Sequence, residues 1–204
     1  MNLFPGHFRK HVRGFTVTEL MAVATLVTGI GTDAYLRGQK KAYETECKSN
    51  LREVGKMIKM YQGSNGEYPD AAFYPKKPRK SSESIINVMK NGGMSVPSEM
   101  WTCPAAPEKL KKKGLTFIYN DQFGGRQSLP KPAKAWLMIE VHCVSDKVPP
   151  PHPNGYNVLF ADGHVITTKK LPRSITSKQE AALKRLWQRV TEGERLTSAF
   201  QTRH

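Results

Sequence analysis

The sequence lacks the short motifs that mark many enzyme classes. It has no nucleophile elbow, no metal-protease motif and no phosphate-binding loop, and it has no internal repeat. It is also poor in acidic residues, with 17 Asp and Glu against 32 Lys and Arg in 204 residues, a net charge of +15. We therefore expect no enzyme, and we expect acidic partners such as nucleic acid, anionic lipid or an acidic neighbouring subunit.

Cysteine is scarce as well. The three cysteines are Cys47, Cys103 and Cys143, and none of them belongs to a Cys-x-x-Cys pair. This spacing excludes a zinc ribbon and a thioredoxin-like motif. In an oxidising compartment two of the three could pair and one would remain.

Proline is absent from residues 15–62, and part of this stretch shows a helical periodicity of apolar residues. One helical face collects residues at spacings of three and four: Tyr43, Cys47, Leu51, Val54, Ile58 and Tyr61. The pattern predicts one continuous helix of about 72 Å at ~1.5 Å per residue. The sequence Gln62 to Pro69, rich in glycine, is expected to end it.

The first third of this helix is apolar. Residues 15–31 contain one acidic residue, Glu19, and the preceding residues 1–14 are basic. We expect 15–36 to cross a membrane with its N-terminus in the cytoplasm, because a span needs about 20 apolar residues and follows the positive-inside tendency. The alternative is a secretory signal removed after the apolar run. Glu19 and the uninterrupted helical pattern argue against that alternative.

The segment from Arg13 to Met21, RGFTVTELM, resembles the type IV prepilin cleavage and methylation motif. The resemblance implies that prepilin peptidase cuts between Gly14 and Phe15 and that the new amino group is methylated. It also implies that Glu19 pairs with the N-terminus of a neighbouring pilin or pseudopilin subunit. A buried carboxylate needs such a counter-charge.

Residues 37–171 are expected to form a small periplasmic α+β head. A short helix is predicted at 81–90 with Ser82 as its cap, and strands at 115–119, 135–141, 157–161 and 164–168. Asp162-Gly163 predicts a hairpin with a type I′ turn. The result is a small antiparallel sheet packed on the amphipathic part of the long helix.

The head also resembles a group of bacterial pilin-like proteins. The similar segments are 47–55, 66–69, 101–104 and 119–120, followed by the H-x9-DG pattern of His152, Asp162 and Gly163. This resemblance implies a type II secretion pseudopilin or a type IV minor pilin, handled by inner-membrane assembly machinery.

Residues 172–204 form a separate tail. Ser177 and Glu180 fit a capping box, and one face then carries Ala182, Leu183, Leu186, Trp187 and Val190. We expect an amphipathic helix that packs on the head or docks on a partner or an anionic lipid surface.

The sequence predicts no cofactor. His152, Asp162 and His164 are candidate metal ligands, but no glutamate or cysteine joins them at a metal-site spacing, so no metal site is expected. A Cys47–Cys103 disulfide is predicted, because Cys47 lies on the helix face that meets the head and Cys103 lies in a proline-stiffened loop. Cys103–Cys143 pairing and three reduced cysteines remain alternatives.

Two functions follow. The first is a structural subunit of a pseudopilus or pilus, assembled through the N-terminal helix. The second is a membrane-anchored binding protein for DNA or another acidic polymer. Residues 1–14 carry three basic residues and no acidic one, so their removal leaves 29 Lys and Arg against 17 acidic residues, or +12. This charge supports the second function.

Overall fold

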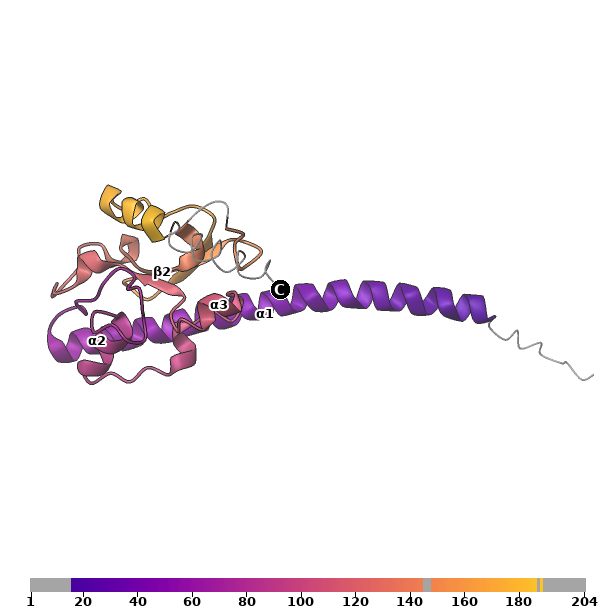
Figure 1. Ribbon diagram of the computed structural model, residues 1–204, viewed down its shortest axis with the longest axis horizontal. Coiled ribbons are helices and arrows are strands. Elements are labelled where there is room, and N and C mark those ends of the chain that lie inside the picture. Colours follow the sequence, from indigo (N-terminus) through magenta and orange to yellow (C-terminus); the bar gives the residue numbers. More distant parts are fainter. Residues whose placement is uncertain (1–15, 145–147, 187, 189–204) are drawn as a thin grey trace, which may run out of the picture. The chain divides into compact units, whose positions relative to one another are not determined.

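The computed structural model describes residues 16–144, 148–186 and 188. It is an α+β chain with a long helix, α1 (Val17–Asn65), and a four-stranded antiparallel sheet (Figure 1). By contact the chain divides into two units, one ending at Gln39 and the other beginning at Lys40. The predicted α+β class is confirmed.

Helix α1 is continuous, as the absence of proline predicts. Its first turn is closed by a capping box: the backbone N–H of Thr16 donates to Glu19 Oε2 at 2.8 Å, and the backbone N–H of Glu19 donates to Thr16 Oγ1 at 3.3 Å. At the other end Gly66 takes a φ of +79°, and its N–H donates to the carbonyl of Gln62. This left-handed glycine ends the helix where the sequence predicts it.

The sheet contains β1 (Phe117–Tyr119), β2 (Trp136–Glu140), β3 (Tyr156–Phe160) and β4 (Val165–Thr168). They follow one another in the order β1-β2-β3-β4, and every neighbouring pair is antiparallel. All four predicted strands are present, with bounds that differ by one or two residues at some ends. The pairing is local throughout, so each strand meets the next along the chain.

The predicted hairpin at Asp162-Gly163 is confirmed, but its turn is of another type. Gly163 has a φ of +99°, while Lys131 is the only described residue other than glycine with a positive φ. A type I′ turn needs positive φ at both central residues, so Asp162 excludes it. The loop instead comprises residues 161–163, closed by a bond from the N–H of Gly163 to the carbonyl of Phe160.

The predicted helix 81–90 begins later than expected. The structure has α2 at Ile85–Asn91, with Ser84 rather than Ser82 at its N-cap and no side-chain capping bond. The backbone before it bends at Ser81, whose carbonyl accepts from Ser84. Short single-turn helices follow at η1 (Ser98–Trp101) and α3 (Glu108–Lys111), and others lie at η2 (Asp121–Phe123), η3 (Pro132–Lys134) and η4 (Val141–Val144).

The core lies between the sheet and the part of α1 after residue 40. The predicted face of α1 is confirmed, because Cys47, Leu51, Val54 and Ile58 are all fully buried. Leu159 of β3 packs against the helix so closely that a Cβ at Gly55 would lie 3.1 Å from its methyl groups. Every residue of β2 and β3 is buried, so both faces of the central strands are covered.

Residues 177–186 form the predicted tail helix, and Leu183 and Leu186 are buried in the head core. The tail therefore packs on the head, which was one of the two expectations. Its cap is one residue earlier than predicted. Thr176 Oγ1 accepts from the N–H of Gln179 at 3.4 Å, and Gln179 Oε1 accepts from the N–H of Thr176 at 3.3 Å. Trp187 and Val190 lie outside the described residues.

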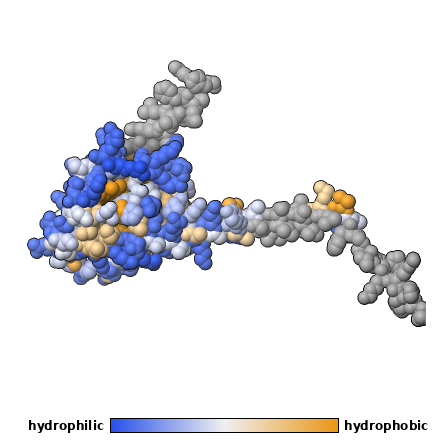
Figure 2. All heavy atoms as spheres, turned by 90° about the horizontal axis from the view of Figure 1, so that it is seen from below, coloured by the Kyte–Doolittle hydropathy of each residue, from blue (hydrophilic) through white to orange (hydrophobic). Residues whose placement is uncertain are grey.

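No helix among the described residues contains a stretch that is both long enough and apolar enough to cross a membrane. Apolar side chains are exposed at the start of α1 (Figure 2), where Val17 is 74% and Met21 66% exposed. Tyr35 and Leu36 are exposed as well. The visible face of the head is mainly hydrophilic (Figure 2).

Candidate functional site

The predicted processing site falls outside the described residues, which begin at Thr16, so Gly14 and Phe15 have no structural outcome. Glu19 is described, and its carboxylate is engaged locally. Besides the backbone bond of the capping box, Thr16 Oγ1 donates to Glu19 Oε2 at 2.9 Å. Glu19 therefore caps α1 in the single chain, a role that the sequence motif does not exclude.

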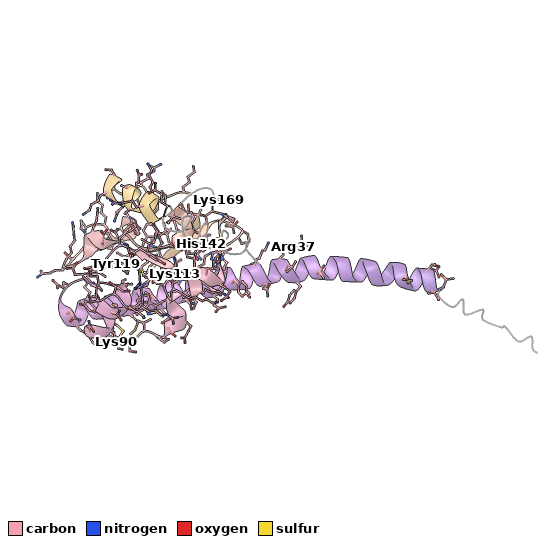
Figure 3. The ribbon with its side chains drawn as sticks, in the orientation of Figure 1. Arg37, Lys90, Lys113, Tyr119, His142 and Lys169 are labelled. Carbon is pink, nitrogen blue, oxygen red and sulfur yellow. The ribbon has the colours of Figure 1, made fainter. Side chains whose placement is uncertain are left out.

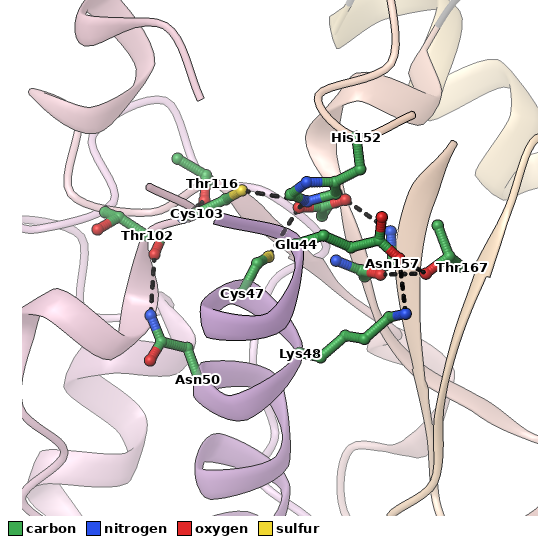
Figure 4. A network of polar contacts seen from close by, with 11 residues as sticks. Glu44, Cys47, Lys48, Asn50, Thr102, Cys103, Thr116, His152, Asn157 and Thr167 are labelled. Atoms are coloured by element: carbon green, nitrogen blue, oxygen red, sulfur yellow. Dashed lines mark hydrogen bonds and ion pairs between the residues drawn. The ribbon is translucent and has the colours of Figure 1, made fainter. Parts of the chain in front are cut away.

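A buried cluster in the head unites four side chains that are distant in the sequence: Cys47, Cys103, Glu140 and His152. One ligand atom from each, two sulfurs, one carboxylate oxygen and one ring nitrogen, lies within 4.8 Å of the others. All four residues are buried. The histidine of the H-x9-DG pattern thus belongs to a buried polar group in the head (Figure 4).

Three hydrogen bonds or contacts join these atoms directly. The Cys47 thiol donates to Glu140 Oε1 at 2.8 Å, and His152 Nε2 lies 3.0 Å from the same oxygen. Cys103 Sγ lies 3.5 Å from His152 Nε2. The other ring nitrogen, Nδ1, is buried and makes no hydrogen bond to the described residues. Nε2 is therefore the nitrogen that faces the cluster.

Two of the four residues come from regular elements. Cys47 lies on the buried face of α1, and Glu140 is the last residue of β2. Cys103 follows η1, where its N–H donates to Thr116 Oγ1 at 2.6 Å. The N–H of Thr116 in turn donates to the carbonyl of Trp101. Thr116 thus fastens the cysteine loop beside the start of β1.

An isolated antiparallel β-bridge holds His152 to Gly155. The N–H of each residue donates to the carbonyl of the other, at 3.2 and 3.1 Å. Gly155 has a φ of +128°, and a Cβ there would lie 2.1 Å from the carbonyl oxygen of Thr168. Only glycine fits both the backbone angle and the contact with β4. The glycine in HPNGY is therefore what lets the loop approach β4 and turn His152 inward.

Burial and mutual contacts shift the pKa of all four groups in the cluster. Burial alone would lower the pKa of His152, but hydrogen bonds to Cys103 and Glu140 outweigh it and raise the pKa to about 9. Burial likewise opposes ionisation of Glu140, yet His152 keeps the pKa of that carboxyl below its usual value. Burial raises the pKa of Cys47, whereas the bond with Cys47 lowers the pKa of Cys103. Glu140 and His152 thus each favour the charged form of the other.

A second layer of hydrogen bonds orients the carboxylate (Figure 4). The backbone N–H of Asn157 donates to Glu140 Oε2 at 2.6 Å. Thr167 Oγ1 bonds to both Asn157 Oδ1 and Glu44 Oε1, and Glu44 forms an ion pair with Lys48 at 2.7 Å. The network connects the buried cluster, through β3 and β4, to the partly exposed side chains of Glu44 and Lys48 on α1.

The predicted Cys47–Cys103 disulfide is not formed in the structure, where all three cysteines are free. The two residues are nevertheless brought together, as the prediction required. Cys47 Sγ donates to Glu140 Oε1, and Cys103 Sγ lies beside His152 Nε2. Cys143 is buried separately, and burial raises its pKa.

The other candidate ligands named from the sequence lie elsewhere. His164 Nδ1 lies 2.6 Å from Asp162 Oδ1 in the exposed hairpin, and Lys59 of α1 donates to the carbonyl of Asp162. Asp162 and Gly163 therefore shape a turn, while His152 belongs to the buried cluster. Glu140 was not among the residues predicted from the sequence. Its one signal is a charged residue inside the apolar strand 135–141.

Positive charge is spread over the surface of the head. Lys90 of α2, Lys113 after α3 and Lys169 after β4 are all exposed and belong to separate elements (Figure 3). His142, in contrast, is buried among the core residues. These three lysines therefore do not form a local basic stripe.

Comparisons with protein-family models, with curated proteins and with solved structures give no match to this chain.

Proposed function

We propose that the chain is a structural subunit of a pseudopilus or pilus, of the type II secretion or type IV pilus kind. After prepilin peptidase removes residues 1–14, it is anchored in the inner membrane by residues 15–36 and carries its head in the periplasm. Assembly machinery of the inner membrane packs it against other subunits through this helix. The motif around Gly14, Phe15 and Glu19, at the start of a 49-residue helix, carries the proposal.

The exposed apolar side chains of α1 support this function. Val17, Met21, Tyr35 and Leu36 are well exposed in the single chain. Apolar surface of this kind is stabilised when lipid or a neighbouring helix covers it. Subunits that pack helix against helix in a filament supply such a cover.

The test is the mature N-terminus of the protein expressed with its prepilin peptidase. We expect mass spectrometry and N-terminal sequencing to give methylated Phe15. Gly14→Leu should stay uncut in the inner membrane, because a bulky side chain precedes the scissile bond. Gly6→Leu, a matched change within the leader, should be cut normally. A mature terminus near Ala34 would instead establish a secretory signal and overturn the proposal.

A further inference from the structure

We propose that Cys47, Cys103, Glu140 and His152 form a zinc site that fastens α1 to the sheet of the head. The ligands are the two thiolate sulfurs, one oxygen of Glu140 and Nε2 of His152, all within 4.8 Å of one another. This inference is independent of the proposed filament function. It rests on side chains of the head alone.

The spacing of the four atoms is close to that of a tetrahedral zinc site. With Zn–S near 2.3 Å and Zn–N and Zn–O near 2.0 Å, neighbouring ligand atoms lie about 3.3–3.8 Å apart. The observed separations are 3.5 Å for Cys103 Sγ to His152 Nε2, 3.0 Å for His152 Nε2 to Glu140 Oε1 and 2.8 Å for Cys47 Sγ to Glu140 Oε1. Changes of up to about 1 Å in these separations bring the four atoms to the tetrahedral spacing and open the space for the ion.

The donor set selects the metal. Thiolate and imidazole ligands together favour zinc among the common ions, whereas calcium, magnesium and manganese take carboxylate, carbonyl and water oxygens. Four protein ligands in a buried cluster leave no open position for water or substrate. The site is therefore structural and not catalytic.

The protein already holds the outer partners that such a site needs. Asn157 donates its backbone N–H to the Glu140 oxygen that does not face the cluster, and this bond orients the ligand. Binding displaces the two thiol protons and the proton of His152 Nε2 to solvent, and no group is oxidised or reduced. The ion thereby replaces the Glu140–His152 pair as the centre of the cluster.

The site would join four segments, from Cys47 in α1 to His152 before β3, whose ligands are separated in turn by 56, 37 and 12 residues. It would also protect Cys47 and Cys103 from forming a disulfide in an oxidising compartment, because both sulfurs are then committed to the metal. Metal binding of this kind contributes directly to the free energy of folding.

The experiment uses the full chain, purified in a mild detergent under reducing conditions and without chelator. We expect about one zinc per chain by elemental mass spectrometry, and a loss of about 10 °C or more in Tm on removal of the metal. Cobalt added to the stripped protein should give the thiolate charge-transfer and intense visible bands of a tetrahedral site. No zinc, an equal content of iron, or cobalt bands without thiolate character would overturn the assignment.

Variants identify the ligands. Cys47→Ser and His152→Ala should each lower the zinc content at least fivefold, and Cys143→Ser, which alters a buried cysteine outside the cluster, should retain it. The cobalt spectrum of the unaltered chain keeps the test decisive if a ligand variant does not fold. Peptide mapping that finds a Cys47–Cys103 disulfide in the protein isolated from the periplasmic face would also overturn the proposal. Neither readout depends on leader cleavage or filament assembly.

Discussion

Glu19 can contribute to this protein by two distinct chemical routes. In the single chain its carboxylate accepts bonds from the N–H and the hydroxyl of Thr16 and so caps the first turn of α1. In the proposed filament it supplies a counter-charge to the amino group of a neighbouring subunit. A carboxylate can accept several hydrogen bonds at once, so one side chain is able to serve both.

Two substitutions at Glu19 separate these routes. Glu19→Gln keeps a capping box, since Gln serves at the third helical position, but removes the charge. Glu19→Ala removes both. We expect both variants to insert and fold, and both to lose most incorporation into sheared filaments, measured by immunoblot against the membrane fraction. If Glu19→Gln assembles like the unaltered chain while Glu19→Ala does not, the carboxylate acts through the helix cap and the counter-charge role is wrong.

Among the elements, the tail helix depends on one glutamine. Gln179 is 2% exposed, completes the capping box with Thr176 and donates to Asn120 Oδ1 at 2.7 Å and to Asp121 Oδ1 at 3.1 Å. It therefore joins the start of the tail helix to the end of β1. Leu183 and Leu186 then fill the core from the same helix.

Replacing Gln179 should loosen this helix. We expect Gln179→Ala to lower the free energy of unfolding by about 1–2 kcal/mol. The change removes the helix cap, and it removes the hydrogen bond that Gln179 donates to the buried Oδ1 of Asn120. Glu180→Ala, which alters the exposed residue that the sequence places in the capping box, should change stability by less than about 0.5 kcal/mol. Urea unfolding of the full chain in detergent measures both. Equal losses would show that the cap is the one predicted from the sequence.

The sequence predicts elements better than their exact ends, for a physical reason. Proline-free periodicity and glycine stops determine α1, and Gly163 determines the hairpin, because these signals act within a few residues. The ends of α2 and of the tail helix shift because several neighbouring residues can cap. Ser82 and Ser84 compete at one helix, and Thr176 and Ser177 at the other.

The cluster of the head is a property of the whole molecule. Nothing in the local sequence brings Cys103 to His152, since their approach depends on the β1-β2-β3 order and on the turn at Gly155. Neither Cys47 nor Cys103 has a second ligand at a metal-motif spacing in the sequence. Sequence motifs therefore do not detect the cluster. Glu140 is the exception, because a charged residue in a buried strand requires a partner.

The net charge of the whole molecule predicts how it meets nucleic acid. With +12 after leader removal and lysines on separate elements, the mature chain should bind duplex DNA weakly and without sequence preference. Because such binding comes from released counterions, we expect the Kd to weaken about tenfold or more between 50 and 200 mM salt, measured by fluorescence anisotropy on the full chain in detergent. Single changes such as Lys90→Ala and Lys169→Ala should each have little effect, because no one lysine dominates a dispersed charge. Nanomolar binding that persists at 200 mM salt, or that one of these changes abolishes, would instead establish a dedicated DNA site and favour capture of an acidic polymer over filament building.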